Sequence, residues 1–134
     1  MYGALDISTS ALVAHRTHLN VIAANIANKR TILNENDEYA PYRRRYVVFG
    51  EGDPAHGQAQ GVHVASIEID NSPLNRRYEP GSPFADTEGY VFYPNVNSVV
   101  ETMDAMLATR AYEANITAIE ATKSMMSATL KILA

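Results

Sequence analysis

The stretch "SVVETMDAMLATRAYEANITAIEATKSMMSATLKILA", residues 98–134, contains neither glycine nor proline. Pro94 precedes it, and Ser98 with Glu101 has the spacing of a capping box at a helix amino end. The sequence therefore predicts a helix that begins at Asn97 or Ser98 and continues to the end of the chain, over about 37 residues or roughly 55 Å. That length exceeds the usual helix of a globular protein, so this stretch decides the fold.

More than half of the circumference of this helix carries apolar or small side chains. We call one row of them, spaced by three or four residues, the alanine row: Val100, Met103, Leu107, Ala111, Ala114, Ala118, Ala121, Met125, Ala128 and Ile132. A second row lies about 120° round the helix: Tyr112, Ile116, Ile119, Met126, Leu130 and Leu133. Alanine is also the best helix former, which by itself explains part of the alanine row. Burying each large side chain is worth about 1.5 to 3 kcal/mol, so the helix needs more partners than this chain supplies.

A second helix is predicted at the amino end, from about Asp6 to Asn28. Its apolar stripe recurs every seven residues, as in a coiled-coil seam: Leu5, Leu12, Leu19 and Ile26, with Ser8, Ile22 and Ala23. Asn25 and Asn28 point nearly opposite this stripe, together with Ala14 and Val21. We therefore expect the two amides to be free to bond the backbone of a neighbouring subunit or to line a polar path. The alternative for Asn28 is a helix cap in the left-handed conformation.

The middle of the chain is irregular, because all six prolines and six of the seven glycines lie between residues 41 and 94. Strands are predicted at 42–49, 61–70, 76–80 and 89–93, and a flexible polar loop at 31–40. The expected fold is α+β: residues 1–30 and 95–134 form a coiled-coil-like helical domain, and residues 31–94 form a small β-rich insert.

The composition excludes several classes of function. The chain has 134 residues, a net charge of −4 and a pI of about 5.5, which argue against nucleic acid or an anionic membrane as partner. It has no cysteine. No apolar run reaches the length of a membrane span, and "MYGALDISTSAL" lacks the features of a Sec signal. We expect a cytosolic protein, or one that leaves the cell without losing a leader.

No catalytic, cofactor-binding or metal site is predicted. His15 and His18 are three residues apart, but no carboxylate completes a metal site, and a hydrogen-bonded interface role for His15 is the simpler interpretation. The arginines of "YRRRY" (42–46) are more typical of the solvated face of a strand, or of a salt-bridging contact, than of a nucleic-acid interface. The sequence has no GxSxG motif, and the carboxylates of residues 35–38 lie in a polar loop. A globular enzyme with an unrecognised site is the competing class.

These features indicate an interaction protein whose helices pair with each other and with neighbouring copies. Heterologous contacts that do not close would produce a helical tube. A soluble adaptor that binds one amphipathic partner helix is the alternative.

The motifs narrow this choice. "SALVAHRTHLNVIAANIANKRT" (10–31) resembles the amino-terminal signature of the bacterial flagellar rod and hook axial proteins, a helix that ends in N-[IL]-A-N and leads into a threonine. "PYRRRYVVF", "GVHVASIEID", "YEPGSPFAD", "GYVFYPNVN" and "MLATRAYEANITAIEATKSMMSATLKIL" resemble the FlgC family of proximal rod proteins in particular. The resemblance runs from about residue 5 to the end, apart from the loops at 32–40 and 50–60.

The resemblance implies a structural, non-catalytic subunit of the flagellar basal-body rod without cofactor, metal or small-molecule substrate. It implies export by the flagellar type III apparatus without a cleaved signal peptide, and assembly with itself, other rod proteins and ring or rod adaptor proteins into the periplasm-spanning shaft. The residues expected at the assembly interface are Leu12, Leu19, Asn25, Ile26, Asn28, Tyr93, Asn95, Leu107, Arg110, Tyr112, Ala114, Asn115, Ala118, Ile119, Met125, Met126 and Leu130.

Overall fold

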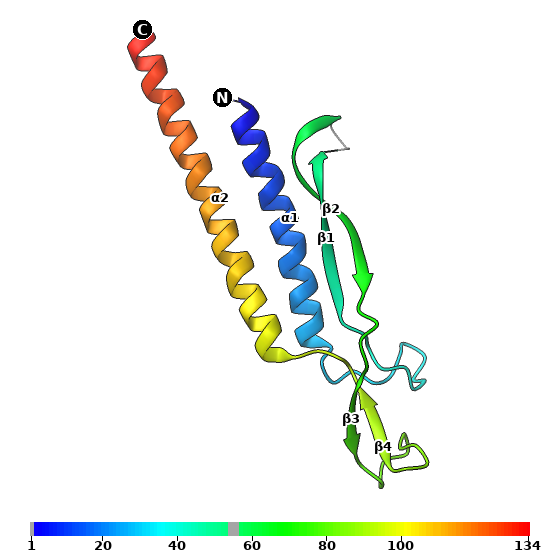
Figure 1. The fold of residues 1–134 in the computed structure, drawn as a ribbon. Coiled ribbons are helices and arrows are strands. Elements are labelled where there is room, and N and C mark those ends of the chain that lie inside the picture. Colours follow the sequence, from blue (N-terminus) through cyan, green and yellow to red (C-terminus); the bar gives the residue numbers. More distant parts are fainter. Residues whose placement is uncertain (1, 54–56) are drawn as a thin grey trace.

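The computed structural model describes residues 2–53 and 57–134 and has two long helices with two small sheets between them (Figure 1). The elements follow in the order α1 (Tyr2–Ala27), β1 (Arg45–Asp53), β2 (Gln58–Ile69), β3 (Asn75–Tyr78), β4 (Tyr90–Tyr93) and α2 (Ser98–Leu133). The predicted α+β class is confirmed, and each predicted strand lies within a few residues of an observed one. Part of the predicted 50–60 loop, residues 54–56, lies outside the described residues.

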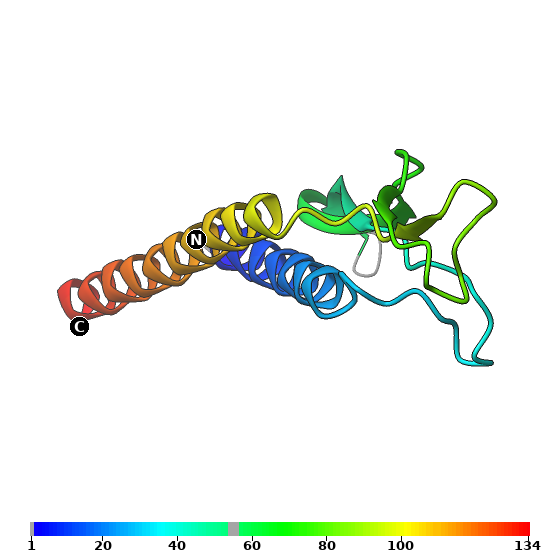
Figure 2. The same ribbon diagram turned by 90° about the horizontal axis from the view of Figure 1, so that it is seen from below.

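The two helices lie side by side and antiparallel, as the views in Figures 1 and 2 agree. Asn25 near the end of α1 bonds Glu101 in the first turns of α2. Since both helices rise about 1.5 Å per residue, the start of α1 lies opposite about residue 124 of α2. Roughly the last ten residues of α2, about 15 Å, therefore extend beyond α1, and Figure 1 shows this overhang.

The amino end of α2 is capped by Asn97, whose side-chain oxygen accepts hydrogen bonds from the backbone N–H groups of Val99 and Val100. The prediction of a capping box from Ser98 to Glu101 is wrong. Glu101 turns into the protein and is fully buried, so its carboxylate is not available to the helix end. The spacing of a capping box does not show which way the carboxylate points. Whether it caps the helix or turns into the protein depends on the tertiary contacts.

The insert consists of two separate antiparallel hairpins, β1–β2 and β3–β4. β1 and β2 pack along α1, on a different side from α2. The β3–β4 hairpin projects beyond the end of the helix pair (Figure 1). The β1–β2 half of the insert therefore shares a core with α1, while the second hairpin stands apart from the helices.

Residues 31–40, where a flexible polar loop was predicted, form a turn closed by hydrogen bonds. The backbone N–H of Ala40 donates to the carbonyl of Ile32 at 2.9 Å. The Asn34 side-chain oxygen accepts the N–H groups of Asn36 and Glu38, each at 2.9 Å. An asparagine that bonds the backbone ahead of it is a typical turn former, and this signal was available in "LNENDEY".

The buried hydrophobic side chains among the described residues are few and none is aromatic: Ala14, Ile22, Val91, Val96 and Ala108. Many larger ones are exposed, above all along α2. A compact chain of this length buries enough apolar surface for an ordinary core. The extended shape instead leaves much of the apolar surface uncovered.

Candidate assembly surfaces

The Asn25 side chain is buried and fully hydrogen-bonded within the chain. It is 1% exposed. Its amide nitrogen donates to the Arg45 carbonyl at 2.8 Å and to the Glu101 carboxylate at 3.0 Å. Its oxygen accepts the Arg45 N–H and the Tyr42 hydroxyl, both at 3.0 Å. The prediction that this amide is free for a neighbouring subunit is wrong, because the face of α1 opposite the leucine stripe is covered by other parts of the chain.

Glu101 accepts that bond with a carboxylate that is 0% exposed. Its second oxygen accepts a short hydrogen bond from the guanidinium of Arg44. Arg44 also lies 3.6 Å from the Asp70 carboxylate and 3.5 Å from that of Asp104. Burial alone would lower the pKa of Arg44, but the hydrogen bond and charge of Glu101 outweigh it and hold this pKa above its ordinary value. The buried Glu101 carboxylate needs an oppositely charged partner, and Arg44 provides it.

We call Asn25, Arg44, Asn95 and Glu101 the polar hub. Asn95 completes it: its side-chain oxygen accepts the Arg44 N–H at 2.8 Å, and its nitrogen donates to the carbonyls of Asp70 and Ser72. The hub thereby ties the end of α1, the start of β1, the end of β2 and the start of α2 together. Asn95, which we expected at an interface between subunits, has its side chain bonded inside its own chain.

Tyr93 is also bonded within the chain. Its hydroxyl donates to the Glu79 carboxylate at 3.1 Å, and this hydrogen bond raises the pKa of Tyr93. Asn28 folds back on the helix end: its nitrogen donates to the Ala24 carbonyl at 2.9 Å, and its oxygen accepts the Thr31 hydroxyl. This is a capping role, but Asn28 is not in the left-handed conformation, which among the described non-glycine residues only Asp37 adopts.

One face of α2 is least exposed, and it is the face of Glu101 and Ala108, the two buried residues of this helix. The half-buried positions that continue this face at steps of three and four include four expected interface residues: Tyr112, Asn115, Ile119 and Met126. Since Glu101 contacts α1, this face is directed toward α1. The Asn115 nitrogen donates to the Ala111 carbonyl of its own helix at 2.8 Å.

The alanine row lies on the open side of α2, because each of its members except Ala111 is exposed. Leu107 is 63% and Met125 58% exposed, and Ala114 and Ala118 are exposed between them. Arg110 and Leu130 are exposed as well. The row is apolar along the whole helix, including the part that lies beside α1. A longer α1 would therefore not cover it, and its partner must come from outside this chain.

On α1, the predicted stripe residue Ile22 is buried and Leu12, Leu19 and Ile26 are half-buried, but Ala14 and Asn25 on the opposite side are buried as well. The buried surface of the helix therefore extends beyond the stripe. α1 contacts both α2 and the β1–β2 sheet, and a helix between two neighbours is covered over a wider arc than a two-helix seam predicts.

The two histidines of α1 pack against β1. The ring of Phe49 lies 5.8 Å from that of His15 and 5.5 Å from that of His18, centroid to centroid. The Nδ1 atom of His15 is buried without a hydrogen-bond partner among the described residues, so a hydrogen bond at this atom within the described chain is not found. Burial lowers the pKa of His18, although the charge of Asp104 acts in the opposite direction.

Over the described residues, no group of three or more histidine, aspartate or glutamate side chains is arranged to hold a metal ion. In the same part of the chain, neither helix combines the length and apolarity that a bilayer-spanning helix requires.

Two family models match the helical ends of the chain. "Flagella basal body rod protein" matches residues 5–29, and "Flagellar basal body rod FlgEFG protein C-terminal" matches residues 87–132. The chain is 45% identical to the flagellar basal-body rod protein FlgC of Salmonella typhimurium, over 95% of this chain and 93% of that protein. It is 39% identical to the FlgC of Borreliella burgdorferi and 38% to that of Bacillus subtilis, each over 97% of the relative and 98% or more of this chain.

The chain belongs to the FlgC family. It is a structural subunit of the bacterial flagellar basal-body rod, which sets aside the alternative of a soluble adaptor. The matched segments of the family models contain nearly all of α1 and of α2, together with β4.

Sequence reasoning had missed the polar hub of this FlgC-family chain. Arg44 was expected either on the solvated face of a strand or in a salt bridge, and the structure shows the salt bridge, whose partners were not predicted. Glu101 was interpreted as part of a helix cap. The available signal was Asn25 itself, because an amide in an apolar helix interior is costly unless it is hydrogen-bonded. The sequence raised that question but did not identify the partners.

Proposed function

We propose that this rod subunit polymerises with its own copies and with other rod proteins into the hollow shaft that joins the membrane ring to the distal rod and hook. The observation that carries the proposal is the alanine row, of which every member except Ala111 remains exposed while α1 covers another face of α2. Burying each of its large side chains would contribute about 1.5 to 3 kcal/mol. Several such residues supply enough free energy to hold subunits together, and small residues between them allow close helix contact.

In this arrangement residues 1–30 and 95–134 form the axial part of the shaft, and residues 31–94 lie outside it. The alanine row, with Leu107, Ala114, Ala118 and Met125, contacts helices of neighbouring subunits. Arg110 and Leu130 flank this contact. The hub residues Asn25 and Asn95 act indirectly, because they fix how the insert sits on the helix pair.

The remaining partners follow from the same proposal. The subunit is exported from the cytoplasm by the flagellar type III apparatus without a cleaved signal peptide, and it contacts ring or rod adaptor proteins of the basal body in the periplasm. The proposal requires no catalytic step, cofactor or small-molecule substrate.

The substitution Ala118→Phe tests the proposal, with Ala118→Ser as matched control. Ala118 is exposed, so neither change should alter the free energy of unfolding of the purified chain by more than about 0.5 kcal/mol. The phenylalanine should prevent close approach of a neighbouring helix. We expect export of both variants, but basal bodies without a complete rod only for Ala118→Phe.

Electron microscopy of basal bodies and a swimming assay read out the result. Complete rods and normal swimming with Ala118→Phe would contradict close packing along the alanine row. Loss of the rod with Ala118→Ser as well would also contradict it, because serine keeps the position small.

A further inference from the structure

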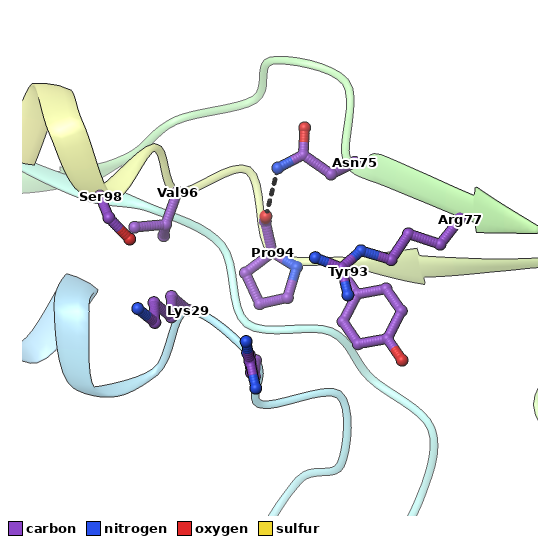
Figure 3. Close-up of a pocket in the computed structure, with 8 residues that line it drawn as sticks. Lys29, Asn75, Arg77, Tyr93, Pro94, Val96 and Ser98 are labelled. Carbon is purple, nitrogen blue, oxygen red and sulfur yellow. Dashed lines mark hydrogen bonds between the residues drawn. The ribbon is translucent and has the colours of Figure 1, made fainter.

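A cleft of about 220 Å³ lies between the end of α1, the β3–β4 hairpin and the segment that leads into α2. Figure 3 shows Lys29 beyond the end of α1 on one side and Asn75 and Arg77 of β3 on the other, with Tyr93 and Pro94 between them. Arg30 also lines the cleft. Its walls therefore come from segments far apart in the sequence.

The cleft is positively charged. Three of its lining residues are cations, Lys29, Arg30 and Arg77, and no lining residue is acidic. None of the three forms an ion pair within the described part of the chain, where the ion pairs all belong to Arg44. The nearby Glu79 carboxylate already accepts the Tyr93 hydroxyl. A concave site with several unpaired cations of one sign attracts an anionic group.

The walls of the cleft are held in place. The Asn75 side chain donates to the Pro94 carbonyl at 3.0 Å, which the dashed line in Figure 3 marks. The Arg77 guanidinium lies over the ring of Tyr93, 5.1 Å from its centroid. A cation that is already positioned loses less conformational entropy when it binds a carboxylate.

The same chain carries a complementary acidic surface. Glu35, Asp37 and Glu38 are exposed on the closed turn of residues 31–40, which Asn34 fixes by hydrogen bonds to its backbone and to the Glu38 carboxylate. We call these three residues the acidic turn. Its carboxylates do not form ion pairs with Lys29, Arg30 or Arg77 in the same chain as the structure describes it.

The acidic turn and the cleft lie at the same end of the molecule, where α1 ends and α2 begins. In two copies placed side by side with the same orientation, the turn of one and the cleft of the next would therefore lie at the same level along the helix axes. A contact between them is heterologous, since different surfaces meet, and it can repeat around a shaft without closing on a dimer.

We propose that the cleft of Lys29, Arg30 and Arg77 binds the acidic turn of a second copy of this chain. The proposal rests on the proposed polymerisation and specifies one lateral contact within it. The carboxylates of Glu35 and Glu38 bind the cations of the neighbouring cleft, and charge-assisted hydrogen bonds of this kind are stronger than neutral ones.

Cysteine cross-linking tests this contact without background, because the chain has no cysteine of its own. Two differently tagged chains, one with Arg77→Cys and the other with Glu35→Cys, are expressed together in a strain lacking the native gene. Basal bodies are then oxidised. The matched control replaces Glu35→Cys with Asp6→Cys, an exposed acidic position near the other end of α1.

We expect a mixed dimer carrying both tags from the Arg77 and Glu35 pair and none from the control pair. Because the cysteines are on separate chains, a contact within one chain gives no dimer. Only monomer, or linkage of the Arg77→Cys chain to a different protein, overturns the proposal.

If a cysteine variant fails to assemble, a second experiment tests the same contact by exchanging the charges of the cleft and of the acidic turn. Lys29→Glu with Arg77→Glu should abolish swimming, and so should Glu35→Lys with Glu38→Lys. The four changes together should restore it. Swimming at the unmodified level with either reversal alone, or no restoration in the combined variant, overturns the proposal.

The two proposals can fail separately. If a strain without this gene still builds complete rods, the proposed polymerisation fails. If that strain loses its rods but the cross-linked dimer does not form, only the cleft contact is wrong.

Discussion

Replacing Asn25 with alanine should destabilise this chain far more than replacing Asn28, although both are asparagines near the end of the same helix. The Asn25 amide makes four hydrogen bonds, to the backbone of Arg45, the Tyr42 hydroxyl and the Glu101 carboxylate. A hydrogen bond contributes about 1 kcal/mol net, and more where a charged group is involved. Asn25→Ala should therefore cost about 4 kcal/mol, a large part of the roughly 5 to 15 kcal/mol that holds a domain folded.

Asn28→Ala is the matched control. Its amide makes two side-chain hydrogen bonds, to Ala24 and Thr31, near the surface, and its loss should cost about 1 kcal/mol. Urea unfolding of the purified chains, followed by circular dichroism, measures both values. Equal costs for the two variants, or an Asn25→Ala chain as stable as the original, would refute the assignment of Asn25 to a buried structural role.

Three further outcomes are expected. Burial lowers the pKa of His18 below its ordinary 6.5, so the unfolded chain binds a proton more readily than the folded chain as the pH falls. The melting temperature should therefore be highest above about pH 6.5 and fall as the pH drops through the folded pKa of His18. His18→Gln should reduce this dependence of the melting temperature on pH. Gly61→Ala should cost about 2 kcal/mol in urea unfolding, because Gly61 has φ +103 and its Cβ would lie 2.7 Å from the Ser10 hydroxyl, whereas Gly81→Ala has open space and should be nearly neutral. Asn97→Ala removes the cap of α2 and should lower stability by about 1 kcal/mol, a loss that Asn97→Asp should largely avoid.

The elements of this fold could be predicted because local signals determine them. Residues 98–134 contain no helix breaker, and glycine and proline separate the strands of the insert. Strand bounds and the start of α2 consequently agree with prediction to within a few residues. Local chemistry does not specify which elements pack together, and the prediction of a two-helix seam along the leucine stripe omitted the β1–β2 sheet.

Because the prediction left out the β1–β2 sheet, it also gave the wrong partners for the site residues. Asn25 was expected to face a neighbouring subunit, but its amide is bonded to Arg45 at the start of β1 and to Glu101 near the start of α2. Glu101 has the spacing of a helix cap, yet its partners Asn25 and Arg44 come from distant parts of the chain. The alanine row could be recognised from its period alone, but that it lies on the open side of α2 required the structure.

Electron microscopy of basal bodies from a strain lacking this gene shows whether the chain is a structural link in the flagellar shaft. We expect membrane rings that persist without rod, hook or filament, and restoration of all three by the unmodified gene. Complete basal bodies and normal swimming in that strain would contradict this role.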